Sequence, residues 1–300
     1  MLGVLFPGQG AQTPGMAAAA IDHPAGREVF TTAAEVLGYD LLELCQNGPA
    51  EKLNQTEYAQ PALFVAGIAA ARVLESTEPQ RLAHAGAVAG LSLGEYTAVC
   101  FAGGLSFEDA LRLVHRRGVA MQSAADAADS GMASVLGMDR DALQRVCDDV
   151  RTGDEVLQPA NLLCPGNIAV SGHTSAIERL IPAATEAGAM KVVPLSVAGA
   201  FHTPIMASAV DQLQSAIDDL QFSDTRLPVY SNVDAAPHTS AEEVRGLLAK
   251  QVVAPVLWGE SIERMIADGV ERFEELGTGR VLRGTLKRIN RKIPADGFGD

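Results

Sequence analysis

The chain has 300 residues, enough for one large domain or for a domain with a smaller companion. Hydrophobic residues make up 47% of it and charged residues 20%, as is ordinary for a globular protein. The net charge of −14 argues against sequence-independent binding to nucleic acid or to an anionic membrane. We therefore expect neither nucleic acid nor a membrane among its partners.

The cysteines and the N-terminus indicate the compartment. The four cysteines form no close pair and no metal-ligand spacing, so we expect free thiols and no metal site. No basic stretch opens the chain, and Pro7-Gly8 interrupts its first apolar run, which argues against a signal peptide. The longest apolar run, 61–71, is too short to span a bilayer. These features favour a cytoplasmic protein.

The N-terminal part alternates strands and helices. The predicted elements are strands at 2–6 and 87–91 and helices at 25–38, 40–46, 60–76 and 107–123. Pro61 is expected in the first turn of its helix, where proline is tolerated. Alternation of this kind predicts a largely parallel sheet that is buried between helices.

The middle of the chain follows another pattern. Its predicted elements are a strand at 132–137, a helix at 140–150, strands at 156–163 and 167–171, a helix at 175–187 and a strand at 190–195. The order β-α-β-β-α-β is that of a ferredoxin-like unit. We therefore predict a small subdomain at 129–196, inserted in a larger α/β subdomain formed by 1–128 and 197–300.

The remaining chain returns to the larger subdomain and ends in a basic segment. Its predicted elements are helices at 206–219, 241–251 and 259–268, strands at 228–231 and 270–274, and a closing helix. From Arg280 to Lys292 there are six basic residues and no acidic one. This run is a candidate site for an acidic partner on an otherwise acidic protein, although a solvated helix would look the same.

The segment Gly90-Leu91-Ser92-Leu93-Gly94 matches the Gly-x-Ser-x-Gly pattern between a strand and a helix. That pattern is typical of a sharp turn that exposes a serine hydroxyl at the end of a sheet. The glycines are needed where side chains would collide in so tight a reversal. Ser92 is thus a candidate nucleophile, and a simple connecting loop is the alternative.

A serine nucleophile needs a base, because its hydroxyl is a poor nucleophile at neutral pH. Of the six histidines, His202 is the best candidate, because it follows an apolar strand and comes after the serine in chain order. His115 lies beside two arginines and would be a weak base there. A histidine that simply packs at a strand end remains the alternative for His202.

Several motifs together resemble one family, the malonyl-CoA:acyl-carrier-protein transacylases. The resemblance covers nearly the whole chain. Its motifs are Leu5-Phe6-Pro7-Gly8-Gln9-Gly10-Ala11-Gln12, Gln60-Pro61-Ala62-Leu63, the Ser92 segment, Arg117-Gly118-Val119-Ala120-Met121-Gln122, Gly199-Ala200-Phe201-His202-Thr203-Pro204, Ser231-Asn232-Val233-Asp234, Gln251 with Pro255-Val256-Leu257-Trp258, and Gly277-Thr278-Gly279-Arg280-Val281-Leu282.

The resemblance implies a fold and a catalytic set. The family's fold is a hydrolase-like core with a mostly parallel sheet and an inserted ferredoxin-like (βαββαβ) subdomain. Ser92 would be the nucleophile and His202 its base. The backbone N–H groups of Gln9 and Leu93 would form the oxyanion hole, and the backbone carbonyl of Gln251 would orient the histidine.

The resemblance also implies how the acyl group is selected. Arg117 would hold the free carboxylate of a malonyl group, and a guanidinium suits this because it pairs bidentately and stays charged when buried. Phe201 would exclude an α-methyl branch. One departure stands out: the family often has His before the nucleophile, and this chain has Leu91 there.

The implied reaction moves a malonyl group from malonyl-CoA to the phosphopantetheine thiol of acyl carrier protein through a seryl-malonyl intermediate, in fatty acid biosynthesis. It needs two substrates, malonyl-CoA and holo acyl carrier protein, and no cofactor. We expect a monomer. The carrier protein would dock on the basic segment, and its candidate contacts are Arg280, Arg283, Lys287 and Arg288.

Three alternatives stay open. A serine thioesterase or esterase would use the same Ser92 and His202, but it has no need for a buried arginine such as Arg117. A trans-acting acyltransferase of a polyketide synthase would share every motif. A catalytically silent module that only binds carrier proteins would not need the three residues together.

Overall fold

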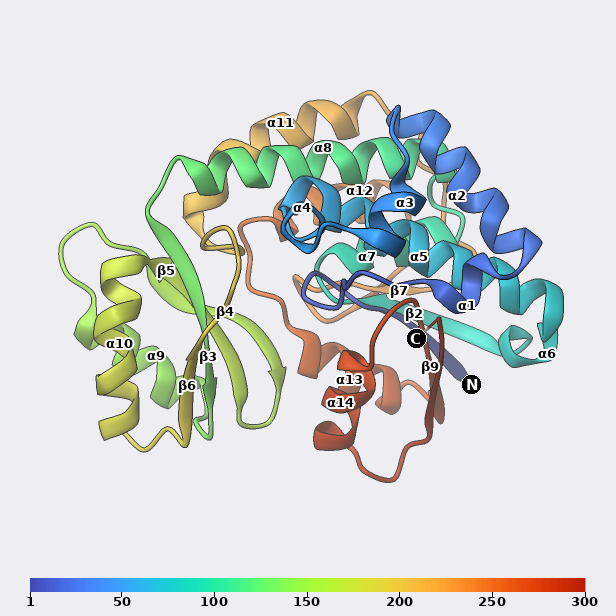
Figure 1. Cartoon of the computed structure of the whole chain (residues 1–300). Coiled ribbons are helices and arrows are strands. Elements are labelled where there is room, and N and C mark those ends of the chain that lie inside the picture. Colours follow the sequence, from blue (N-terminus) through green and yellow to red (C-terminus); the bar gives the residue numbers. More distant parts are fainter. Residues whose placement is uncertain (300) are drawn as a thin grey trace.

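The computed structural model describes residues 1–299 and consists of two sheets with helices around them (Figure 1). The larger sheet has six strands in the order β10-β9-β1-β2-β7-β8, and every neighbouring pair is parallel except β7 and β8. Its strands are β1 Leu2–Phe6, β2 Ala85–Gly90, β7 Val229–Tyr230, β8 Pro237–His238, β9 Arg272–Leu276 and β10 Ala295–Phe298.

Helices cover both faces of this sheet. They are α1 Ala18–Ile21, α2 Pro24–Leu37, α3 Leu41–Asn47, α4 Ala50–Leu53, α5 Thr56–Thr77, α6 Pro79–Leu82, α7 Leu93–Phe101, α8 Phe107–Asp126, the short 3-10 helix η1 Pro204–Met206, α11 Ala207–Asp218, α12 Ala241–Gln251, α13 Trp258–Ala267 and α14 Val281–Ile289. In β1, Val4 and Phe6 belong to the core shared with α5 and α8, whereas Leu5 packs with residues of α13 and α14. A strand buried on both faces explains its continuous apolar run.

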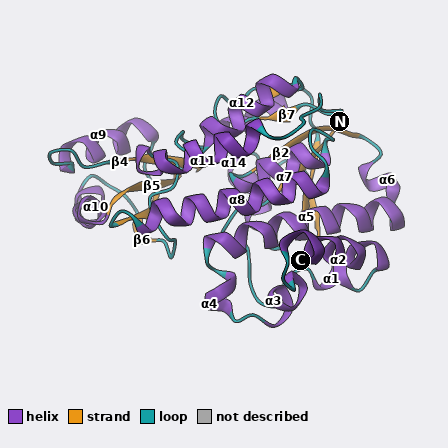
Figure 2. Ribbon diagram, turned by 90° about the horizontal axis from the view of Figure 1, so that it is seen from above, coloured by secondary structure: helices purple, strands orange, loops and turns teal. Residues whose placement is uncertain are grey.

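The smaller sheet is antiparallel and lies at one end of the molecule, with its two helices on one side (Figure 2). Its elements are β3 Ser130–Leu136, α9 Arg140–Val150, β4 Leu157–Cys164, β5 Asn167–His173, α10 Thr174–Glu186 and β6 Lys191–Pro194. The strand order β4-β5-β3-β6 with this connectivity is the ferredoxin-like arrangement. The predicted fold class, a parallel α/β core with a βαββαβ insertion, is therefore confirmed.

Some predicted bounds were wrong. The helix predicted at 60–76 begins four residues earlier, at Thr56, so Pro61 lies inside α5 and not in its first turn. Helix α5 is almost wholly buried, and its packing compensates for the hydrogen bond that the proline cannot donate. Strands β8 and β10 were not predicted, because two or four residues at a sheet edge carry little periodic signal.

Backbone hydrogen bonds join strand β4 of the smaller sheet to the larger subdomain at Val256. The N–H of Val256 donates to the carbonyl of Ala160 at 2.8 Å, and the N–H of Leu162 donates to the carbonyl of Val256 at 2.9 Å. These bonds hold β4 against the segment that follows α12. Among residues 1–299, no helix is both long enough and apolar enough to cross a membrane.

Candidate active site

Ser92 lies at the sharp turn between β2 and α7, with φ 51° and ψ −102°. Non-glycine residues rarely adopt such a backbone, and it persists only where its surroundings hold it. A Cβ on Gly90 would come within 1.9 Å of the backbone of Gly94, and one on Gly94 within 2.1 Å of the carbonyl oxygen of Phe6. The close approach predicted for the two glycines is thus present.

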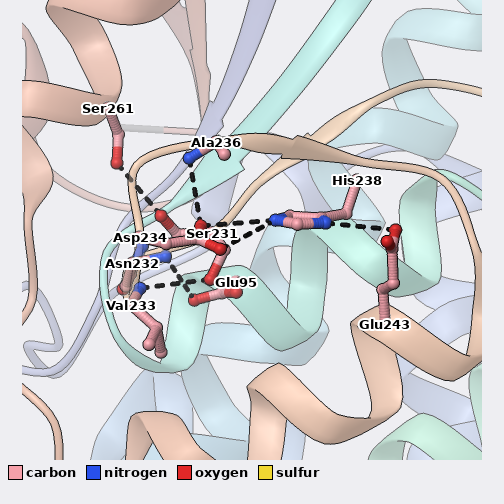
Figure 3. A network of polar contacts seen from close by, with 9 residues as sticks. All are labelled: Glu95, Ser231, Asn232, Val233, Asp234, Ala236, His238, Glu243 and Ser261. Atoms are coloured by element: carbon pink, nitrogen blue, oxygen red, sulfur yellow. Dashed lines mark hydrogen bonds and ion pairs between the residues drawn. The ribbon is translucent and has the colours of Figure 1, made fainter.

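Asn232 holds this turn from the loop after β7. Its Oδ1 accepts from the N–H of Ser92 at 2.7 Å, and its Nδ2 donates to the carbonyl of Gly90 at 2.8 Å. Figure 3 shows Asn232 in a compact loop, beside Glu95 of α7. The side chain is fully buried, so it replaces water for two backbone groups that the turn leaves without partners.

His202 lies directly against the serine. Its Nε2 is 2.8 Å from the Oγ of Ser92, and its Nδ1 is 2.9 Å from the backbone oxygen of Gln251. A carbonyl oxygen can only accept, so Nδ1 carries the proton and Nε2 is free to accept from the hydroxyl. Burial, together with the charge of Arg117, lowers the pKa of His202 to about 4, which keeps the ring neutral at neutral pH.

Two backbone N–H groups flank the serine. Leu93 is the first residue of α7, and Gln9 lies in the loop after β1. The two loops meet because β1 and β2 are parallel and end together, with Phe6 opposite Gly90. Among residues 1–299 neither N–H has a hydrogen-bond acceptor, so both remain available as donors beside the cavity.

Arg117 of α8 is fully buried, whereas its neighbour Arg116 is exposed. Its Nη1 donates to the Oε1 of Gln60 at 2.8 Å, and its Nη2 donates to the Oγ of Ser92 at 3.0 Å and to the Oε1 of Gln251 at 2.9 Å. The guanidinium also lies 4.9 Å from the ring centre of Tyr96. Its Nε has no partner among residues 1–299.

A cavity of about 90 Å³ brings these groups together. Met132 and Asn161 of the smaller sheet line one part of it. The residues of the larger subdomain that line it include Ser92, His202, Arg117, Gln9, Phe201 and Leu91. A larger cavity of about 450 Å³, lined by Cys164 and Glu263 among others, contains none of the predicted site residues.

The basic residues predicted to meet a partner differ in exposure. Arg280, Lys287 and Arg288 are exposed, whereas Arg283 is half-buried and pairs with the buried carboxylate of Glu275 at 3.1 Å. Arg288 also lines a groove together with Arg291, which follows α14, Lys191 of β6 and Met190, which precedes β6. Arg291 belongs to the basic run 280–292 that the sequence singled out, whereas Lys191 and Met190 were not included.

Four further polar side chains support the site and were not assigned a role from the sequence: Gln60, Glu95, Asn232 and the amide of Gln251. Each lies within or beside a quoted motif. Nothing in a single sequence separates a buried glutamine or glutamate from an exposed one, so only the fold identifies them.

Comparisons with known proteins agree with this geometry. The acyl transferase domain family matches residues 4–288. The chain is 39% identical over 298 residues to the malonyl CoA-acyl carrier protein transacylase of Haemophilus influenzae, covering 99% of this chain and 95% of that one. The structure of the malonyl CoA-acyl carrier protein transacylase from Coxiella burnetii is 36% identical and superimposes with a TM-score of 0.95 over 99% of this chain and 93% of that one. A malonyl-transacylase in complex with its type II PKS acyl-carrier protein is 38% identical, with a TM-score of 0.95 over 100% and 96%.

We predict that Asn232→Ala destabilises the protein by about 2–4 kcal/mol, because two buried backbone groups lose their partner. Urea denaturation monitored by circular dichroism measures this. Asn47→Ala, at an exposed position on α3, is the matched control and should change the unfolding free energy by less than about 0.5 kcal/mol. Equal effects at the two positions would contradict the role of Asn232 in holding the turn.

Proposed function

The chain belongs to the acyl transferase domain family, and from this premise we propose that it transfers a malonyl group from malonyl-CoA to the phosphopantetheine thiol of acyl carrier protein. One observation carries the proposal: a fully buried guanidinium, Arg117, touches the hydroxyl of the paired Ser92 and His202. A hydrolase of simple esters has no use for a buried positive charge at that point. A carboxylate-bearing acyl group does.

In the first half-reaction the Oγ of Ser92 attacks the thioester carbonyl of malonyl-CoA, and the Nε2 of His202 takes the hydroxyl proton. The bond from Oγ to carbon forms, and the carbonyl oxygen becomes an oxyanion that accepts from the N–H groups of Gln9 and Leu93. The carbon–sulfur bond then breaks. The departing sulfur of coenzyme A takes the proton from His202, which leaves malonyl-Ser92.

In the second half-reaction the phosphopantetheine thiol of the carrier protein enters the same cavity. His202 takes its proton, the sulfur attacks the seryl ester, and the oxyanion forms in the same place. When the bond from carbon to Oγ breaks, His202 returns the proton to Ser92. Gln251 serves both halves, because its carbonyl keeps the Nδ1 proton in place and so keeps Nε2 available as a base.

Arg117 would select the acyl group and also affect the base. Burial, and after it the charge of Arg117, holds the pKa of His202 low, at about 4, which makes a weak base. A malonyl carboxylate bound to Arg117 would offset the second of these causes and so raise the pKa of His202. An acetyl group cannot do this. Phe201 lines the same cavity, where its ring would exclude an α-methyl branch.

We propose the groove between α14 and the smaller sheet as the docking site of the carrier protein. Arg288 of α14, Arg291 just after that helix and Lys191 of β6 line it, around the exposed Met190. Exposed positive charges suit an acidic carrier domain and would speed its association. Arg283 contributes less, because it already pairs with Glu275. Lys287 and Arg280 would lie at the edge of the site.

We propose that the reaction belongs to fatty acid biosynthesis and takes place in the cytoplasm. We further propose that the enzyme is a monomer and that its small subdomain spans residues 129–196. A transacylase that serves a polyketide carrier is the second candidate, and the similarity to the malonyl-transacylase bound to a type II PKS carrier protein favours keeping it. The chemistry is the same in both cases. The carrier protein that accepts malonyl fastest decides between them.

We predict that the protein gains the mass of one malonyl group when it is incubated with malonyl-CoA, and loses it to holo carrier protein. Intact-mass spectrometry measures both steps. Ser92→Ala should remain folded and gain no mass, because the attacking oxygen is missing. A folded wild-type protein that forms no adduct would overturn the proposal, and loss of malonate to water at the rate of transfer would favour a thioesterase.

Arg117→Ala is expected to lower kcat/KM for malonyl transfer by about 30-fold or more, because losing one partner of a buried charge pair costs about 2–5 kcal/mol. Acetyl transfer should fall by less than about tenfold, since an acetyl group forms no charge pair with Arg117. Steady-state kinetics with malonyl-CoA and acetyl-CoA measure both. Arg116→Ala, the exposed neighbour on the same helix, is the control and should alter neither.

Reversing two charges of the groove, Arg288→Glu with Arg291→Glu, should raise KM for the carrier protein by about tenfold and weaken its dependence on salt. Formation of malonyl-Ser92 from malonyl-CoA should change far less. Arg27→Glu on α2 controls for one change of charge at an exposed site elsewhere. If the control raises KM for the carrier protein as much, the groove is not the docking site.

A further inference from the structure

Glu95 is a buried carboxylate that none of the steps above uses. It lies in the first turn of α7, three residues after Ser92, and is 2% exposed. Its Oε2 accepts from the Nε2 of Gln251 at 2.6 Å and from the N–H of Asn232 at 3.1 Å. Figure 3 shows it pointing from the helix toward the loop that contains Asn232 and Ser231. Ionised glutamates are rarely buried without a reason.

Gln251 connects Glu95 with His202, Ser92 and Arg117. Its backbone oxygen accepts from His202 at 2.9 Å, and its Oε1 accepts from the Nη2 of Arg117 at 2.9 Å. Its Nε2 donates to the carbonyl of Ser92 at 2.9 Å as well as to Glu95. One side chain and its own carbonyl therefore contact the base, the nucleophile's backbone and the buried cation.

Glu95 fixes which way the amide of Gln251 points. The carboxylate and the carbonyl of Ser92 can only accept, so the nitrogen of the amide must face them. The oxygen is then left to face Arg117. The opposite orientation would set an NH₂ group against the guanidinium and an oxygen against the carboxylate, which is unfavourable at both ends.

Glu95 also balances the charge of Arg117. All hydrogen-bond partners of the guanidinium are neutral oxygens, from Gln60, Gln251 and Ser92. Within residues 1–299 no carboxylate lies at ion-pair distance from it, although Glu95 acts on it electrostatically across Gln251. A buried cation without any compensating charge is strongly destabilising, so an indirect counter-charge matters here.

We propose that Glu95 is a positioning residue for acyl transfer: it orients Gln251 toward Arg117 and His202, and its charge balances Arg117 until an acyl carboxylate takes that place. The inference rests on the proposed malonyl transfer. It adds that the enzyme exchanges one counter-charge for another. When the carboxylate of malonyl binds Arg117, two negative groups share one cation, and Glu95 takes up a proton.

The protonation of Glu95 is suited to this exchange. Burial raises its pKa to about 7, against the hydrogen bonds from Gln251, Asn232 and Ser231 and the charge of Arg117, which lower it. The other titratable groups around it are Tyr96, whose pKa burial raises to about 12, and His202, whose pKa burial lowers to about 4. Both are neutral near pH 7, so Glu95 and Arg117 are the groups whose charges matter.

Malonyl binding should weaken as the pH rises. A second carboxylate favours protonated Glu95, so malonyl binds best below a pH of about 7 and less well above it. We expect the ratio of kcat/KM for malonyl-CoA to kcat/KM for acetyl-CoA to fall about fivefold between about pH 6 and about pH 8. The pH dependence of kcat/KM reports the free enzyme, in which His202 is the same for both substrates, so its protonation cancels in this ratio.

Glu95→Gln separates charge from orientation. One amide oxygen can still accept from both Gln251 and Asn232, and the hydroxyl of Ser231 can turn to suit the new NH₂ group. The ratio should then be independent of pH. Glu274→Gln, a change at a buried glutamate of β9 that pairs with Arg81, is the matched control and should keep the wild-type dependence.

Two further measurements complete the test. Glu95→Ala removes the acceptor as well and should lower kcat at least about tenfold with both substrates, because Gln251 is no longer held. Binding of malonyl-CoA to Ser92→Ala, measured by calorimetry in buffers of different ionisation enthalpy at about pH 7.5, should show proton uptake that acetyl-CoA does not cause. This measurement tests the exchange of charge even if the Glu95 variants do not fold.

The outcomes are distinct. A ratio that does not change with pH in the wild-type enzyme, or binding of malonyl-CoA without proton uptake, would overturn the exchange of counter-charges. Wild-type kcat in Glu95→Ala would overturn the positioning role. If the wild-type enzyme transfers no malonyl group at any pH, the proposed function itself is wrong, which the intact-mass experiment shows separately.

Discussion

The buried charge of Arg117 is the constraint on which the rest of the site depends. A guanidinium away from water is tolerated only when its donors are met and its charge is compensated. Here Gln60, Gln251 and Ser92 meet the donors of its two terminal nitrogens, while Nε has no partner among residues 1–299. The guanidinium is therefore held in place by neutral oxygens, and its charge and its Nε–H can still bind a carboxylate.

The parallel sheet explains why residues so far apart in the chain reach this charge. The strands β1 and β2 end side by side, which sets the loop of Gln9 against the turn at Ser92, and β7 ends next to them with Asn232. Helices α8 and α12 then add Arg117 and Gln251. The smaller sheet supplies the far wall of the cavity, and its backbone bonds to Val256 keep that wall in place.

Much of the fold and part of the site could be predicted from the sequence, for different physical reasons. The alternation of strands and helices and the βαββαβ order were visible because long elements carry a periodic pattern. The start of α5 was not, since Pro61 looked like a helix start and tertiary burial of α5 outweighed it. The pairing of Ser92 with His202 and Arg117 lies where the motifs placed it, whereas the supporting Glu95 and Asn232 became visible only once the fold gave them partners. The boundaries at 129 and 196 stay a prediction.

A Ser–His pair alone does not distinguish a transferase from a hydrolase, because water is also a nucleophile. In this chain the base itself can depend on the acyl group. Burial and the positive charge of Arg117 keep His202 a weak base, and an acyl group with its own carboxylate would contact Arg117 directly, which Glu95 reaches only across Gln251. Binding of the acyl carboxylate to Arg117 would then both select the substrate and make His202 a stronger base.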